Sequence, residues 1–221
     1  MLDRLLEAFA PHICCSCGDK TALLCEYCEY DIISERFSYC LACEKPTVDS
    51  NLCTGCHLRV AYDDAWVVGW RDEGLKRLID LYKFERTRAG ADVIARLLDH
   101  ILPQLPPETV ITYIPTIPLH RRQRGYDHMK LTAEALARRR SLQSNSLLHR
   151  LTALPQLGSD KKSRLVRQRG AFEVPTNIET PVLLLDDIYT TGATITAGVA
   201  ALRHASQQPI FVGVVARQPF K

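Results

Sequence analysis

The chain has 221 residues, of which 46% are hydrophobic and 24% are charged, and its formal net charge is +3. This composition is ordinary for a soluble globular protein and allows a hydrophobic core of useful size. No apolar run approaches the roughly 18 residues that a membrane-spanning helix needs. Residues 1–10 lack the basic start and long apolar centre of a signal peptide, so we expect a cytoplasmic protein with no membrane span.

All nine cysteines lie between residues 14 and 56, and eight of them form C-x-x-C pairs. In chain order the pairs are Cys14/Cys17, Cys25/Cys28, Cys40/Cys43 and Cys53/Cys56. Each such turn presents two thiolates to one ion, and two turns complete a tetrahedral Cys₄ site. We therefore expect a zinc ribbon over residues 1–60 that holds two structural zinc ions, whose binding supplies much of its folding energy.

The spacing leaves two questions about these cysteines open. Seven residues separate the first two pairs and nine separate the last two. Pairing of consecutive turns on one zinc is the simpler arrangement, and interleaved pairing is the alternative. Cys15 is left over, and it could replace Cys14 as a ligand although its spacing to Cys17 is poorer.

Beyond the cysteines, hydrophobic periodicity predicts strands that alternate with helices. The predicted strands are 66–70, 110–114, 183–185 and 210–216. The predicted helices are 72–82, 89–102, 128–140 and 193–204. This alternation is typical of an α/β domain with a parallel sheet and helices on both faces, and we assign it residues 61–221.

The charge is unevenly distributed along the chain. Residues 1–62 carry 5 Lys/Arg against 9 Asp/Glu, whereas residues 118–172 carry 13 Lys/Arg against 3 Asp/Glu, an excess of 10 positive charges. A basic segment of this kind suits ligands that bear phosphate, including nucleic acid. A solvated basic surface is the alternative, and the neighbouring motif must decide between them.

The most specific pattern follows the apolar run 182–185. Asp186 and Asp187 come directly after it, and the segment TTGAT (190–194) then leads into a predicted helix. Carboxylates at the end of a strand can accept hydrogen bonds from the vicinal hydroxyls of a ribose. A Thr/Gly-rich turn at a helix N-terminus offers N–H groups and hydroxyls to a phosphate, and Gly192 lets the backbone approach it closely.

This segment resembles the signature of type I phosphoribosyltransferases that binds phosphoribosyl pyrophosphate (PRPP). The resemblance implies a type I phosphoribosyltransferase-like fold in which Asp186 and Asp187 hold the ribose hydroxyls. It also implies a loop for the 5-phosphate, made of Thr190, Thr191, Gly192, Ala193 and Thr194. In that chemistry magnesium accompanies PRPP and neutralises its pyrophosphate.

A cysteine array ahead of such a domain resembles the ComF/GntX family, which is linked to natural competence and DNA uptake. The segments LYKFE (81–85), VITYIPTIP (110–118) and RRQRGY (121–126) are similar to further marks of that family. They contain the candidate pyrophosphate or anion contacts, which are Lys83, Thr116, Arg121, Arg122 and Arg124. The chain departs from the family at Asp127-His128, where Asn-Gln is usual, and at Arg167, near a usual Asn.

The resemblance implies a ComF-like, PRPP-binding protein of DNA uptake and natural transformation that contacts single-stranded DNA and DNA-uptake proteins. One alternative is a phosphoribosyltransferase of nucleotide salvage or biosynthesis, which would transfer ribose 5-phosphate to a base or an amine. Another is a PRPP sensor without turnover. No general base stands out in the sequence, and fold alone does not choose between these functions.

Overall fold

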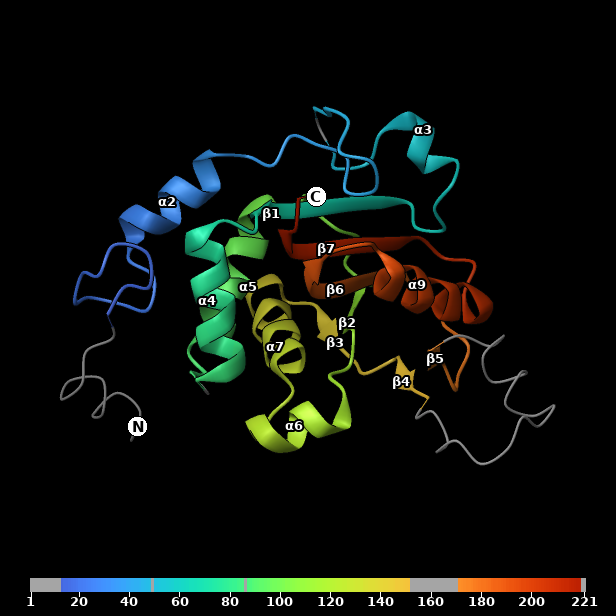
Figure 1. Ribbon diagram of the computed structural model, residues 1–221. Coiled ribbons are helices and arrows are strands. Elements are labelled where there is room, and N and C mark those ends of the chain that lie inside the picture. The colour runs from blue at the N-terminus through green and yellow to red at the C-terminus, as the bar shows by residue number, and fades with distance from the viewer. Residues whose placement is uncertain (1–12, 49, 86, 152–170, 220–221) are drawn as a thin grey trace, which may run out of the picture.

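A five-stranded parallel sheet forms the centre of the molecule (Figure 1). The computed structural model describes residues 13–48, 50–85, 87–151 and 171–219. From edge to edge the strands are β1 (Asp64–Trp70), β7 (Ile210–Arg217), β6 (Val182–Tyr189), β2 (Val110–Tyr113) and β3 (Gln143–Ser144). All neighbouring strands in this sheet run parallel, as the sequence predicts.

Helices cover both faces of the sheet (Figure 1). One face carries α4 (Glu73–Phe84), α5 (Gly90–Ile101) and α7 (His128–Arg140). The other face carries α9 (Ala193–Ala205) and a small antiparallel pair made of β4 (His149–Arg150) and β5 (Phe172–Glu173).

Alternate side chains of the central strand β6 serve the two cores. Leu183 and Leu185 pack in the core beneath α4, α5 and α7. Val182 and Leu184 pack in the core beneath α9. Successive residues of a strand point to opposite faces, so one apolar run fills both cores and identifies β6 as a strand covered on both sides.

The eight predicted strands and helices of the α/β part are present, with bounds that differ by a few residues. The largest difference is at β6, which was predicted to end at residue 185 but continues to Tyr189. Its continuation is held by β7, because Asp186 pairs with Val214 and Tyr189 pairs with Arg217. The two acids therefore lie inside the strand and not after it. Among the described helices, none is long and apolar enough to cross a membrane.

The cysteine-containing segments pack against the same two cores. The first segment leads into α2 (Glu26–Ser34) and buries Leu23 and Leu24 in the core beneath α4 and α5. The second segment ends with α3 (Thr54–His57) and buries Phe37 and Leu41 in the core beneath α9. Figure 1 shows the two segments on either side of the β1 edge of the sheet.

Candidate functional site

Eight cysteines gather into two groups of four. Within each group the sulfur atoms all lie within 4.8 Å of one another. The first group is Cys14, Cys17, Cys25 and Cys28, and the second is Cys40, Cys43, Cys53 and Cys56. Consecutive C-x-x-C turns therefore share a site, which confirms the simpler of the two pairings.

The sulfur positions fit a tetrahedral zinc ion. The Sγ atoms of Cys17 and Cys25 are 3.7 Å apart, and those of Cys43 and Cys53 are 3.6 Å apart. Four sulfurs placed about 2.3 Å from a tetrahedral zinc are separated by about 3.8 Å. Burial opposes ionisation of the Cys14 thiol, but backbone N–H groups, including that of Cys17, lower its pKa to about 6. Burial raises the pKa of the Cys28 and Cys56 thiols, which a metal ion would have to deprotonate because the thiolate is the form that binds metal. The sulfur distances within each group show that the two Cys₄ sites could hold two zinc ions.

Cys15 belongs to neither group. Its side chain is buried in the core beside Leu23, and burial raises the pKa of its thiol to about 11. A protonated, buried thiol of this kind packs as a small apolar side chain. Cys14, and not Cys15, is therefore the residue in position to bind metal.

Asp186 and Asp187 lie in the part of β6 that pairs with β7 but no longer with β2. β2 ends at Tyr113, which pairs with Leu185, whereas β7 continues to pair with β6 past both acids. The carboxyl edge of the sheet is the place where open α/β folds bind ligands. Both acids are nevertheless only 8% exposed, so their charges depend on nearby protein groups.

Asp187 is held in its ionised form by two groups from different elements. Lys83, in the last turn of α4, places its ammonium nitrogen 2.7 Å from a carboxylate oxygen of Asp187. His128, the first residue of α7, contacts the same oxygen through Nε2. Burial opposes the charge, but Lys83 and His128 hold the pKa of Asp187 below its usual value.

The other nitrogen of His128 shows which tautomer is present. Arg124 donates a hydrogen bond to Nδ1 at 2.7 Å, so that nitrogen accepts and Nε2 carries the proton. Nε2 therefore donates to Asp187. Arg124 also donates from Nε to the carbonyl oxygen of Lys83 at 2.5 Å. These four residues form one connected cluster from α4, α6 (Pro118–Arg124), α7 and β6.

The pKa of Asp186 is shifted in the opposite direction to that of Asp187. Burial, together with the Asp187 charge, raises the pKa of Asp186 well above its ordinary value. Its carboxyl accepts a hydrogen bond from the Asp187 backbone N–H at 2.9 Å. Asp186 therefore keeps its proton to a higher pH than an exposed carboxyl does, and the pair offers both a hydrogen-bond donor and acceptors to a diol.

The predicted phosphate loop follows β6 directly and begins α9. Gly192 precedes the helix with a φ of 79°, in the left-handed region that favours glycine. The other four residues of the loop are exposed: Thr190, Thr191, Ala193 and Thr194. The first N–H groups of a helix lack intrahelical acceptors, so this end of α9 can receive an anion.

The loop after β2 is held in place by Asp127. The Asp127 carboxylate accepts hydrogen bonds from the Thr116 N–H at 2.8 Å and from the Thr116 hydroxyl at 2.9 Å. It also caps α7 by accepting from the Lys130 N–H. Thr116, Arg121 and Asp127 line a cavity of about 470 Å³ beside this loop. An anion would reach the Thr116 donors only by displacing Asp127.

The three candidate arginines of the R-R-x-R segment divide into two kinds. Arg121 and Arg122 are exposed on α6, where they can meet an anion. Arg124 is buried and contacts Lys83 and His128, as described above. The sequence alone does not separate them, because the direction of each side chain depends on how α6 packs against α4 and α7.

Part of the basic stretch is neutralised within the protein. Arg139 and Arg140 form ion pairs with Asp99 of α5, and Arg138 pairs with Asp92. These arginines therefore contribute less to a basic surface than their number suggests. Residues 161–169 of the same basic segment, which could cover the ligand or contact nucleic acid, lie outside the described residues.

Arg150 contributes a positive charge that the sequence analysis missed. It donates to the carbonyl oxygen of Pro115 at 3.1 Å. Its positive charge partly offsets the rise in the pKa of Asp186. Its guanidinium also lies over the ring of Phe172, 4.7 Å from the ring centroid. His128 is also assigned no role from the sequence. The departure at Asp127-His128 was the one signal that pointed to it.

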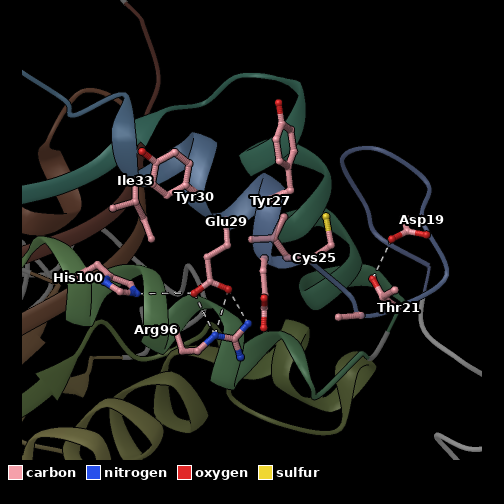
Figure 2. Close-up of a pocket in the computed structure, with 12 residues that line it drawn as sticks. Asp19, Thr21, Cys25, Tyr27, Glu29, Tyr30, Ile33, Arg96 and His100 are labelled. Carbon is pink, nitrogen blue, oxygen red and sulfur yellow. Dashed lines mark hydrogen bonds and ion pairs between the residues drawn. The ribbon is translucent and has the colours of Figure 1, made fainter.

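A separate cavity of about 1080 Å³ lies between the first cysteine cluster and α5 (Figure 2). Figure 2 shows Glu29 of α2 directed at Arg96 and His100 of α5, and the shortest contact to Arg96 is 2.7 Å. Tyr27 and Tyr30 lie on its rim and are exposed. This cavity contains neither the acid pair nor the phosphate loop.

The predicted residues thus meet at the carboxyl edge of one sheet. Lys83, in α4, is distant in sequence from Asp186 and Asp187 in β6 but contacts Asp187, and the loop 190–194 follows β6 directly. The two Cys₄ clusters and the parallel sheet fit the ComF/GntX resemblance. No protein-family model matches the chain, and no curated protein matches it either.

Proposed function

We propose that this protein binds PRPP, or a related phosphoribosyl ligand, at the carboxyl edge of its sheet. The observation that carries the proposal is the placement of Asp186 and Asp187 beyond the end of β2, directly ahead of the loop that begins α9. A ribose over the acid pair would have its hydroxyls at the carboxyl groups and its 5-phosphate at the helix N-terminus.

The charges of the site suit such a ligand. Asp187 and Lys83 neutralise each other, so the acids do not repel an incoming anion as two bare carboxylates would. The helix N-terminus and the Thr190 and Thr191 hydroxyls supply donors for a phosphate. Arg121 and Arg122 are exposed on α6 and would add positive charge toward the pyrophosphate. Magnesium would neutralise the pyrophosphate when it is bound with the ligand.

Within this proposal, the role that the resemblance favours is ComF-like: a PRPP-binding protein of DNA uptake that contacts single-stranded DNA. Two Cys₄ clusters ahead of the domain, together with the basic segment 118–172, support it. Transfer of ribose 5-phosphate to a base or an amine is the alternative. At position 127 the ComF/GntX family usually has Asn. In this chain Asp127 stands there and accepts a hydrogen bond from the Thr116 N–H, so this part of the site differs from the family pattern.

The test is calorimetry with PRPP and Mg²⁺ on the wild type and on Asp186→Ala/Asp187→Ala. Asp92→Ala is the matched control, because Asp92 is an exposed carboxylate on α5. We expect the wild type and the control to bind PRPP and the double variant to lose binding. Absence of PRPP binding by a folded, zinc-loaded wild type would refute the proposal.

A titration with single-stranded DNA then separates the two roles. A DNA-binding protein releases counterions, so its affinity falls steeply as the salt concentration rises. Arg121→Ala/Arg122→Ala should weaken that binding and reduce the salt dependence. If PRPP binds and DNA does not, the metabolic role is favoured, and turnover with bases and amines becomes the next measurement.

A further inference from the structure

Arg217 is the last residue of β7, and its side chain has no exposed surface. On one side it contacts the turn of the second cysteine cluster. Its Nε donates to the Leu41 carbonyl oxygen at 3.1 Å, and its guanidinium forms an ion pair with Glu44 at 3.0 Å. Leu41 lies between Cys40 and Cys43, and Glu44 follows Cys43, so Arg217 holds the turn that carries two cluster sulfurs.

On its other side, the same guanidinium holds the start of the phosphate loop. Nη1 donates to the Thr190 carbonyl oxygen at 2.8 Å and to the Tyr189 carbonyl oxygen at 3.3 Å. The guanidinium carbon also lies 4.8 Å from the centroid of the Tyr189 ring. The Tyr189 hydroxyl is in turn adjacent to Gly192, where a Cβ atom would overlap it.

We infer that Arg217 is a positioning residue that couples the second Cys₄ cluster to the Thr190–Thr194 loop. Loading of that cluster with zinc keeps the loop in the conformation that receives an anion. The inference rests on the proposed function only for what the loop binds. The coupling itself rests on the contacts of Arg217.

The physical reason is that a buried guanidinium must keep its partners. Arginine has five donors in a fixed planar fork, so its partners on both sides are positioned relative to each other. A buried cation that loses partners is costly, so movement of the cluster turn forces Arg217 to find new ones. The turn carries two of the four cluster sulfurs, those of Cys40 and Cys43, so gathering of the sulfurs around a metal ion would restrain it. Its backbone is closed by a hydrogen bond from the Glu44 N–H to the Cys40 carbonyl oxygen at 2.9 Å.

The first test compares loop dynamics in Arg217→Lys and Arg203→Lys, both loaded with zinc. Arg203 is a matched control because it also bonds two carbonyl oxygens, of Ala61 and Gln208, and pairs with Asp63. None of these partners belongs to the loop. We expect the NMR order parameters of the Thr190 and Thr191 amides to fall from about 0.85 to below about 0.6 in Arg217→Lys only. Unchanged order parameters, or an equal fall in Arg203→Lys, would overturn the inference.

Glu44→Gln keeps the experiment decisive if Arg217→Lys does not fold. It removes one charged partner of Arg217 at a side chain that is 23% exposed, and should lower the same order parameters by a smaller amount. A folded Glu44→Gln with two zinc ions and an unaltered loop counts against the coupling.

The second test removes one cluster at a time. Cys53→Ser breaks the second cluster and Cys25→Ser breaks the first, and both cysteines are half-buried. We expect the order parameters of the Thr190 and Thr191 amides to fall further in Cys53→Ser than in Cys25→Ser, and PRPP affinity to fall roughly tenfold more in Cys53→Ser than in Cys25→Ser. Equal effects of the two variants on the loop would contradict the coupling. If the wild type binds no PRPP, the proposed function fails, and the order parameters still decide whether the coupling exists.

Discussion

Asp186 and Asp187 are adjacent in sequence, yet their carboxyl groups have opposite electrostatic surroundings. Burial and the neighbouring charge raise the pKa of Asp186, whereas Lys83 and His128 lower that of Asp187 in spite of burial. An unfolded Asp has a pKa of about 3.9. The contribution of Asp187 to stability is therefore present above that value and is lost as the pH falls through the folded pKa. The sign is reversed for Asp186, whose ionisation at rising pH lowers the free energy of unfolding.

This difference predicts that the two acids respond differently to Asn. Asp187→Asn leaves the half-buried Lys83 ammonium without its carboxylate, and we expect the free energy of unfolding at pH 7 to fall by about 2–3 kcal/mol. Asp186→Asn keeps an oxygen for the Asp187 N–H and removes an unfavourable ionisation, so stability should be unchanged or higher. Urea unfolding at pH 5 and pH 8 measures both. A greater loss for Asp186→Asn than for Asp187→Asn would show that the assignment is reversed.

At the scale of the element, the turn from β6 into α9 depends on one glycine. Gly192 has a φ of 79°, and a Cβ atom there would overlap the Tyr189 ring. The ring cannot move freely, because the Arg217 guanidinium lies over it. The start of α9 is therefore fixed by packing against Tyr189 and Arg217 as well as by its own backbone conformation.

We predict that Gly192→Ala displaces the loop and abolishes PRPP binding in calorimetry. Left-handed backbone alone costs an L-residue about 1–2 kcal/mol, and the overlap with Tyr189 adds to it. Gly18→Ala is the control, since Gly18 has a φ of 84° but open space around its Cβ position. It should lower the melting temperature slightly and leave PRPP binding intact. If Gly192→Ala bound PRPP as tightly as the control does, the loop would not be the phosphate site.

At the scale of the whole molecule, the two cysteine clusters support different cores. Leu23 and Leu24, beside the first cluster, pack under α4 and α5, whereas Phe37 and Leu41, beside the second, pack with α9. Loss of either metal would release apolar side chains from a core that also supports the sheet. Metal binding should therefore stabilise the complete fold, and not only the ribbon.

We expect metal analysis to find two zinc ions per chain. Cys14→Ser should reduce this to one, because it removes a sulfur from the first cluster. Cys15→Ala should keep both ions and only lower stability, because Cys15 packs in the core. A chelator should lower the melting temperature of the wild type. Loss of zinc from Cys15→Ala, or its retention in Cys14→Ser, would reverse the assignment of the ligand.

Most of the secondary structure and the two groups of clustered cysteines could be predicted from the sequence. The C-x-x-C spacing identifies the eight clustered cysteines, and hydrophobic periodicity places the helix 128–140 with the bounds that the structure has. The acid pair and the TTGAT segment indicate a site at the end of a strand. These features can be predicted because ligand type, turn chemistry and periodicity each depend on residues that are close together in the sequence.

Only the tertiary structure decided which partners these residues meet. It pairs consecutive cysteine turns, buries Cys15, turns Arg124 inward and brings Lys83 and His128 to Asp187. It also extends β6 past the acids, because β7 continues beside them where β2 has ended. Arg217 shows the same limit, since nothing near it in sequence indicates that it joins a cysteine turn to a loop. Such contacts depend on how distant elements pack, and local spacing does not encode that packing.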